Sequence, residues 1–124
     1  LGLDAATQAT HEARRAQHYA RIVGAGAVYS QSFSEGNAAA SGSAAFSTTA
    51  RRVPGGWRVN GTKIFASLSG NAHYYGILCT ELGEDDTVSR RQTAYIAVPA
   101  DAPGVTVSGS WDPLGMRGTV SRNL

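Results

Sequence analysis

An aromatic residue and a hydroxyl near the middle of the chain could together bind a flat organic ring. They are Phe65 and Ser67, at the end of the stretch 57–67, WRVNGTKIFAS. Within it, Asn60-Gly61 is the dipeptide that a tight type I′ hairpin turn favours, because both central positions need positive φ. We therefore expect two short strands on either side of this turn, with residues alternating between a buried face and a free face. Phe65 and Ser67, two positions apart, would share one face, the ring covering a flat ligand and the hydroxyl donating a hydrogen bond to its edge.

No self-contained catalytic centre is evident in the rest of the sequence. The three histidines, His11, His18 and His73, do not have the spacing of a metal site. The sequence has no Ser-His-Asp signature, no GxGxxG fingerprint and no Walker loop. The acidic residues at 81–86 fall in a polar stretch typical of a solvated turn. We therefore expect neither a catalytic residue nor a metal site within this chain.

The elements that would position Phe65 and Ser67 are one helix followed by short strands. Residues 4–23 are rich in Ala, lack Gly and Pro, and begin at Asp4, a favourable N-cap, while Gly24-Ala25-Gly26 would end the helix. Alternation and turn residues predict strands at 27–33, 43–53, 57–59, 62–67, 73–80, 92–98 and 104–109, with a truncated strand at the C-terminus. The fold class predicted is mainly β: a small barrel or two packed antiparallel sheets preceded by one helix.

The composition argues against several classes of function. The 124 residues suffice for one domain with one core. Eleven Lys and Arg against nine Asp and Glu, with no basic stripe, give no reason to expect a nucleic-acid partner. No apolar run approaches the ~20 residues that a membrane-spanning helix needs. The single cysteine, Cys79, cannot form an internal disulfide and lies in an apolar run, which favours a core thiol in a reducing, cytoplasmic setting.

Four stretches of the sequence, in order, carry a resemblance to a known family. They are QSFSEGN at 31–37, AASGS at 39–43, GGWRVNGTKIFAS at 55–67 and WDPLGMRGTVS at 111–121. These resemble the strand end aromatic-x-Leu-Thr-Glu-Pro-Gly, the loop Gly-Ser-Asp, the motif Gly-x-x-x-x-Asn-Gly-x-Lys-x-Trp-Ile-Thr/Ser and the segment Leu-Gly-x-Arg-Gly-Thr/Ser-x-Ser of the acyl-CoA dehydrogenase middle domain. Their order and spacing match over roughly residues 25–124, so the sequence is similar to that domain as a whole.

The resemblance implies a piece of a three-domain α-β-α flavoprotein. Residues 27–124 would be the middle β-domain, and residues 1–26 a helix of, or leading from, an N-terminal helical domain. The residues that would contact FAD by this resemblance are Gln31, Phe33, Ser34, Phe65 and Ser67. Either Ala40 or Ser41 falls at the family's usual Ser position near the substrate, and we favour Ser41 because it keeps the hydroxyl.

The activity implied is oxidation of the α,β bond of an acyl-CoA, with FAD as the hydride acceptor. An electron-transfer flavoprotein would accept the electrons next, and the whole enzyme would be a homodimer or homotetramer. The family's catalytic base is a Glu of the C-terminal helical domain, which this chain does not contain. Glu35 matches instead a strand-end Glu with a structural role, so this chain alone should not turn over substrate.

Departures from the family pattern leave a second function open. Phe65 replaces the usual Trp, Ser34 replaces Thr, and Gly36 replaces Pro. Related flavin monooxygenases and nitroalkane-oxidase-like enzymes share the domain, and some carry another aromatic residue at the position of Phe65. A third interpretation is a β-sandwich binding module without a flavin, but hairpin chemistry explains only one of the four stretches.

Overall fold

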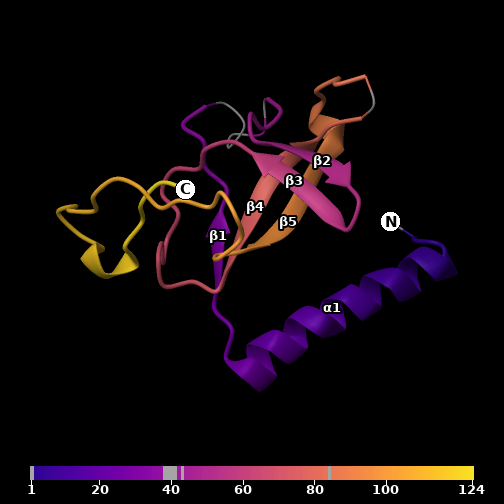
Figure 1. Ribbon diagram of the computed structural model, residues 1–124, viewed down its shortest axis with the longest axis horizontal. Coiled ribbons are helices and arrows are strands. Elements are labelled where there is room, and N and C mark those ends of the chain that lie inside the picture. Colours follow the sequence, from indigo (N-terminus) through magenta and orange to yellow (C-terminus); the bar gives the residue numbers. More distant parts are fainter. Residues whose placement is uncertain (1, 38–41, 43, 84) are drawn as a thin grey trace.

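The computed structural model describes residues 2–37, 42, 44–83 and 85–124 (Figure 1). Within them the chain forms one long helix and a β-sheet, so the mainly β prediction with a preceding helix is confirmed. The elements are α1 (Ala5–Ala25), β1 (Tyr29–Ser32), β2 (Thr49–Val53), β3 (Gly56–Asn60), β4 (Tyr74–Glu81), the 3-10 turn η1 (Arg90–Gln92), β5 (Thr93–Pro99) and the 3-10 turn η2 (Arg117–Thr119).

Helix α1 lies apart from the sheet, below it in the view of Figure 1. It begins as expected, with the Asp4 side chain accepting a hydrogen bond from Thr7 N, and it ends at Gly26 in the left-handed conformation. None of its residues is buried. Near its C-terminal end, His18 Nδ1 lies 2.9 Å from the Tyr29 hydroxyl, and the Arg21 guanidinium lies over the ring of Tyr74. The helix is therefore connected to the sheet at this end, while its apolar side chains Tyr19, Ile22 and Val23 stay exposed.

Strand β4 is the centre of the sheet. It pairs with β5 in antiparallel fashion along Tyr74–Thr80, while β1 and then β2 lie in parallel along its other edge. Strand β3 follows at the outer edge of β2. The described strands thus form a single mixed sheet, whereas a small barrel or two packed antiparallel sheets were expected. The sheet is mixed because both β1 and β2 run in the direction of β4.

The core lies on one face of this sheet. Its buried members are Ala50, Ala72, Tyr75, Ile77 and Cys79, with partly buried side chains of β3, β5 and residues 100–124 packed around them. Cys79 is fully buried, and burial raises the pKa of its thiol to about 11. It is therefore the core thiol that the sequence indicated, and it is chemically quiet at neutral pH.

The hairpin expected at Asn60-Gly61 is not formed. The turn lies instead at Pro54-Gly55, where Gly55 has a φ of 83° and β2 pairs with β3 on either side. Gly61 has a φ of 156°, which residues with a side chain rarely adopt, and a Cβ there would lie 2.6 Å from the Cα of Thr48. Glycine is thus required at this position by the close approach of another segment of backbone and not by a turn.

Three other strand predictions need correction. Residues 62–67 do not form a strand beside β3; their backbone pairs instead with the C-terminal residues, with Lys63 and Leu124 exchanging two hydrogen bonds of 2.9 Å. The strand predicted at 43–53 is limited to β2, and 104–109 contains only an isolated bridge between Ser108 and Asn123. In each case the alternation of residue types was present, but the backbone had no continuous partner strand.

Candidate functional site

A buried ion pair anchors the segment that carries Phe65 and Ser67. The side chains of Lys63 and Glu35 are 2% and 3% exposed, and Lys63 Nζ lies 2.7 Å from Glu35 Oε1. Lys63 Nζ also donates to the carbonyl oxygens of Phe33, at 3.3 Å, and Leu78. We call Lys63 and Glu35 the buried anchor, because this pair links the end of β1, strand β4 and the segment 62–67.

Hydrogen bonds satisfy the carboxylate of the anchor from several sides. Glu35 accepts from Ser47 N at 2.7 Å and from Thr48 N at 2.8 Å, besides Lys63. Burial alone would raise the pKa of Glu35, but these hydrogen bonds outweigh it and hold the pKa at about 2. Burial lowers the pKa of Lys63, against the attraction of Glu35. Glu35 is thus an ionised carboxylate whose two oxygens already accept hydrogen bonds from the protein. This environment agrees with its expected structural role.

The anchor holds two predicted site segments against each other. Ile64 N donates to Ser34 O at 2.8 Å, and the Ser30 hydroxyl donates to Ser67 O. The ring of Phe33 is 40% exposed and that of Phe65 is 61% exposed. We call Gln31, Phe33, Ser34, Phe65 and Ser67 the strand-end face. Ser41, the predicted substrate contact, lies outside the described residues.

Tyr95 of β5 is a member of this neighbourhood that the sequence did not reveal. Its hydroxyl donates to Gln31 Oε1 at 2.9 Å, and its ring meets that of Phe33 edge to face, with centroids 6.1 Å apart. The Tyr95 side chain reaches Gln31 by crossing over Gly76, where an added Cβ would overlap the phenol. The combination of an aromatic residue on β5 and a glycine on the neighbouring strand could have signalled this contact only once their register was known.

Strained backbone is concentrated beside the strand-end face. Among the described residues other than glycine, five have positive φ, and four of them are Phe65, Leu68, Met116 and Val120. Bulky side chains rarely adopt this conformation, and such outliers tend to occur at functional sites. They lie in the segments 65–69 and 116–122, which are joined by backbone hydrogen bonds from Ala66 to Arg122, from Leu68 to Thr119 and from Ser69 to Val120.

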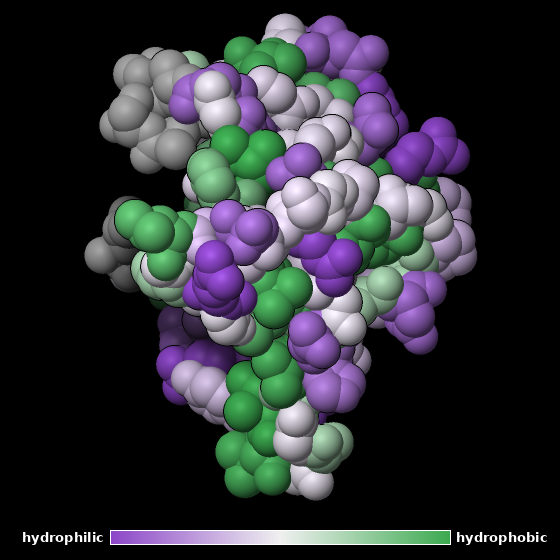
Figure 2. All heavy atoms as spheres, turned by 90° about the vertical axis from the view of Figure 1, so that its left-hand side faces the viewer, coloured by the Kyte–Doolittle hydropathy of each residue, from purple (hydrophilic) through white to green (hydrophobic). Residues whose placement is uncertain are grey.

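The positive φ of Phe65 corrects the reason why Phe65 and Ser67 were expected to act together. A strand would place Lys63, Phe65 and Ser67 on one face, but Lys63 is 2% exposed and Phe65 is 61% exposed. With a φ of 55°, the backbone at Phe65 turns the ring outward, where it meets Trp111 edge to face at 6.3 Å. Figure 2 shows the side of the molecule that carries the C-terminal loop, and hydrophobic residues there are interspersed with hydrophilic ones.

The hydroxyl of Ser67 belongs to a chain of hydroxyl groups. Ser67 Oγ lies 2.9 Å from Ser121 Oγ, and Ser121 Oγ lies 2.8 Å from Thr119 Oγ1. Thr119 Oγ1 in turn lies 3.0 Å from the carbonyl oxygen of Met116. Ser121 is 7% exposed, whereas Ser67 is half-buried. These hydrogen bonds thus connect the turn at Met116 and Thr119, through the buried Ser121, to Ser67. Neither Ser121 nor Thr119 was expected to take part in the site.

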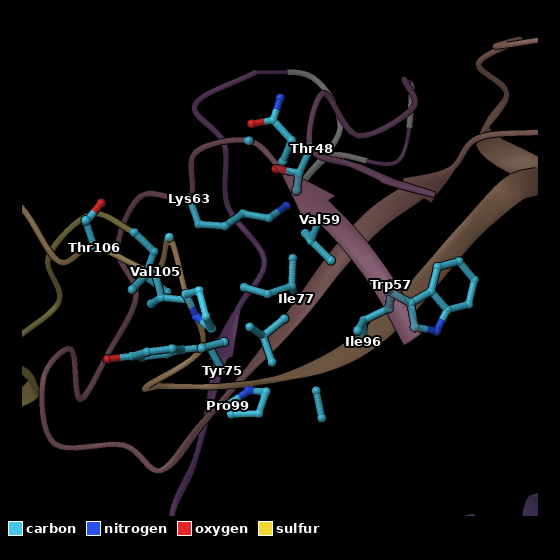
Figure 3. Close-up of a pocket in the computed structure, with 18 of the residues that line it drawn as sticks. Thr48, Trp57, Val59, Lys63, Tyr75, Ile77, Ile96, Pro99, Val105 and Thr106 are labelled. Carbon is cyan, nitrogen blue, oxygen red and sulfur yellow. The ribbon is translucent and has the colours of Figure 1, made fainter. Parts of the chain in front are cut away.

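A cavity lies elsewhere, on the core side of the sheet. Its volume is about 760 Å³, and Trp57, Tyr75, Ile77, Ile96 and Val105 are among the residues that line it (Figure 3). These belong to the hydrophobic core cluster or pack against it. None of the predicted site residues lines this cavity. It is therefore the open side of the core, and we do not interpret it as the site.

The described residues contain no group of three or more His, Cys, Asp or Glu side chains placed to hold a metal ion. Among the helices in the described part of the chain, none combines the length and the apolar character needed to cross a membrane.

Comparison with known proteins places this fold in a family. Residues 30–124 match the family "Acyl-CoA dehydrogenase, middle domain". Because the match covers most of the chain, the protein belongs to the acyl-CoA dehydrogenase family through this domain. The resemblance drawn from the four sequence stretches is thereby confirmed.

The relatives within this family differ in their chemistry. The chain is 36% identical to L-evernosamine nitrososynthase of Micromonospora sp. (strain ATCC 39149 / NRRL 15099 / SCC 1413) over 51% of its length, and 34% identical to YdbM of Bacillus subtilis (strain 168), provisionally assigned as an acyl-CoA dehydrogenase, over 62%. Among solved structures, FMN-bound TdsC from Paenibacillus sp. A11-2 is 31% identical over 87% of this chain, with a TM-score of 0.70. The chain spans 14%, 19% and 26% of these three proteins.

Proposed function

We propose that this chain is the flavin-binding middle domain of a flavin-dependent oxidoreductase. The observation that carries the proposal is that the buried anchor brings the end of β1 and the segment 63–67 together, and that each of these two segments exposes an aromatic ring, Phe33 and Phe65. An exposed aromatic surface with a polar group at its margin suits a flat heteroaromatic ring. Membership of the family and the FMN bound by TdsC support the same ligand class.

The residues of the strand-end face would have distinct roles toward such a ring. Phe65 would cover it, while backbone groups of Gln31 and Phe33 and the hydroxyls of Ser34 and Ser67 would hydrogen-bond its polar edge. Tyr95 would hold the Gln31 side chain in place, because the two are already hydrogen-bonded. When bound, the flavin would supply the electron-accepting chemistry that these side chains lack. FAD is the form proposed, and FMN is the alternative that TdsC supports.

The remaining parts of the active site would lie outside this chain. In the proposed arrangement, residues 27–124 form the middle domain and residues 1–26 lead from an N-terminal helical domain. The exposed Tyr19, Ile22 and Val23 of α1 suit a helix that packs against other helices. Glu35 is held by Lys63 and two backbone amides, so the catalytic base would be supplied by another domain.

The first candidate reaction is dehydrogenation of the α,β bond of an acyl-CoA, which the similarity to YdbM supports. Ser41 would then approach the thioester, and an electron-transfer flavoprotein would reoxidise the enzyme. A cytoplasmic homodimer or homotetramer belongs to the same proposal.

The second candidate is an oxygen-dependent oxidation of a substrate other than an acyl-CoA. The similarity to L-evernosamine nitrososynthase favours it, since that name denotes formation of a nitroso group. The replacement of Trp by Phe65 in the third sequence stretch also fits this branch.

The experiment that tests the proposal is a visible absorption spectrum of the intact parent protein. A protein that takes up FAD or FMN, and whose flavin bleaches when acyl-CoAs are added without oxygen, would support dehydrogenation. Flavin that bleaches only with another reductant, followed by oxygen-dependent product formation, would support the second candidate. A protein that takes up neither flavin would overturn the proposed function together with the roles of Phe65 and Ser67.

A further inference from the structure

The hydroxyl chain of Ser67, Ser121 and Thr119 has a direction that elementary hydrogen-bond chemistry fixes. The carbonyl oxygen of Met116 can only accept, so Thr119 must use its single hydroxyl proton to donate to it. Thr119 then has only lone pairs left for Ser121, which must donate its own proton to Thr119. Ser121 is left as an acceptor, so Ser67 donates inward to Ser121. In this state the Ser67 hydroxyl can only accept a hydrogen bond from a ligand bound at the strand-end face.

The direction of this chain can reverse without any bond between the hydroxyl groups being lost. If Thr119 turns its proton toward Ser121, then Ser121 can donate to Ser67, and Ser67 can donate outward. The cost is the hydrogen bond from Thr119 to Met116, which is one neutral hydrogen bond. The Ser67 hydroxyl can therefore serve as an acceptor at no cost, and as a donor only at the cost of one hydrogen bond, either that one or its own bond to Ser121.

We propose that Ser121 and Thr119 are positioning residues that set whether Ser67 accepts from or donates to a ligand at the strand-end face. The inference rests on the proposed flavin function. The polar edge of an oxidised isoalloxazine ring offers acceptors at N5 and the C4 carbonyl, whereas the reduced ring carries a proton on N5. The chain as found matches a donor on the ligand and so favours the reduced ring; its reversed form matches the oxidised ring.

The surroundings of the chain indicate that this arrangement is held in place. Ser67 lies between Phe65 and Leu68, and Thr119 and Ser121 flank Val120; all three of these neighbours have positive φ. The two segments are joined by hydrogen bonds from Ala66 N to Arg122 O and from Leu68 N to Thr119 O, of 2.9 Å and 2.7 Å. The distances between the hydroxyl groups are thereby set by the backbone, so that rotation of protons remains the main freedom.

The test uses the intact parent protein with bound flavin, and measures the reduction midpoint of bound against free flavin. By a thermodynamic cycle, this difference reports the ratio of the affinities for the oxidised and the reduced ring. Ser121→Ala and Thr119→Val both free Ser67 to donate outward, so each should shift the ratio toward oxidised flavin by roughly fivefold, the effect of about one neutral hydrogen bond. Ser121→Thr and Thr119→Ser keep a hydroxyl group, so both should have the wild-type ratio of affinities for oxidised and reduced flavin.

Two controls separate this effect from a general loss of structure. Thr10→Ala removes a hydroxyl that also donates to a backbone carbonyl, on α1, and should leave the ratio unchanged. In a Ser67→Ala background, Ser121→Ala should have no further effect, because the hydroxyl group that would meet the ligand is already absent. An unchanged ratio in both Ser121→Ala and Thr119→Val with flavin bound would overturn the positioning role and leave the proposed function intact. A wild-type protein that binds no flavin would overturn the proposed function and this inference with it.

Discussion

The buried anchor and the strand-end face lie close together in the sequence but differ in every physical respect. Lys63 is 2% exposed and charged, and its ammonium group is paired with Glu35; Phe65, two residues later, is 61% exposed and apolar. The difference arises because the backbone at Phe65 has a φ of 55° and does not continue as a strand. A short segment can thus be held in place by one buried side chain, Lys63, and expose another, Phe65, to solvent. The anchor should therefore control stability, and the strand-end face should control binding.

The largest effect should come from breaking the anchor. Lys63→Ala would leave the Glu35 carboxylate buried without its cationic partner, which we expect to lower the free energy of unfolding by about 3–5 kcal/mol. Urea denaturation of the intact protein measures it. The matched control is Arg52→Ala, which removes an ion pair with Glu81 whose arginine is 73% exposed, and should cost less than about 1 kcal/mol. Equal losses in the two variants would contradict the special position of the anchor.

The free energy of unfolding at acid pH should also depend on the Lys63–Glu35 pair. The pKa of Glu35 is held at about 2, below its usual 4.5, so its contribution is fully present above about pH 4.5. It is then lost as the pH falls through the range between the two values, because the unfolded chain takes up the proton first. Unfolding free energies measured across that range should fall less steeply in Glu35→Gln than in wild type. An unaltered slope would show that Glu35 is not the group responsible.

A smaller effect should follow from disturbing the support of Gln31. Gly76→Ala would place a methyl group where the Tyr95 phenol crosses β4, and overpacking of this kind costs about 1–3 kcal/mol. Tyr95→Phe is the matched control, since it removes only the hydrogen bond to Gln31 and should cost less than about 1 kcal/mol. Thermal unfolding of both variants checks the order. In a Tyr95→Ala background, Gly76→Ala should no longer cost stability, because the phenol that the methyl group overlaps is gone. If it costs as much as in wild type, overlap with Tyr95 is not the cause.

The sequence predicted more of the elements than of their partners. The helix, its Asp4 cap and the strands near 27–33, 73–80 and 92–98 follow from local propensities, and the structure has them. The parallel pairing of β1 and β2 with β4 could not be predicted, because register depends on tertiary contacts. The same reason explains Gly61, which looked like a turn residue but is required by the backbone of Thr48.

The residues of the candidate site were predicted from a strand pattern and from a resemblance, and not from the contacts that hold them in place. Phe65 and Ser67 were chosen as partners on one strand face, yet Phe65 is placed by a positive φ and Ser67 by its hydroxyl chain. Tyr95, Ser121 and Thr119 join the site from segments distant in the sequence, and local pattern gave no signal of their contacts. A resemblance to a family indicates which positions of a sequence belong to a site. The contacts that hold those residues in place become known only from the three-dimensional structure.

The smallest change in stability, with a clear change in binding, should come from Phe65→Gly. Glycine relieves the cost of the left-handed conformation, about 1–2 kcal/mol, but it also loses more backbone entropy on folding, by about 0.5–1 kcal/mol. Because the ring is 61% exposed, we expect the free energy of unfolding to change by no more than about 1 kcal/mol. Loss of the aromatic contact, worth about 0.5–1.5 kcal/mol, should weaken flavin binding roughly two- to tenfold in a fluorescence titration. Phe65→Trp, which keeps an aromatic ring, should bind flavin as wild type does. If Phe65→Gly instead unfolds the protein with flavin affinity unchanged, the ring packs the fold, and the division of labour between the buried anchor and the strand-end face is wrong.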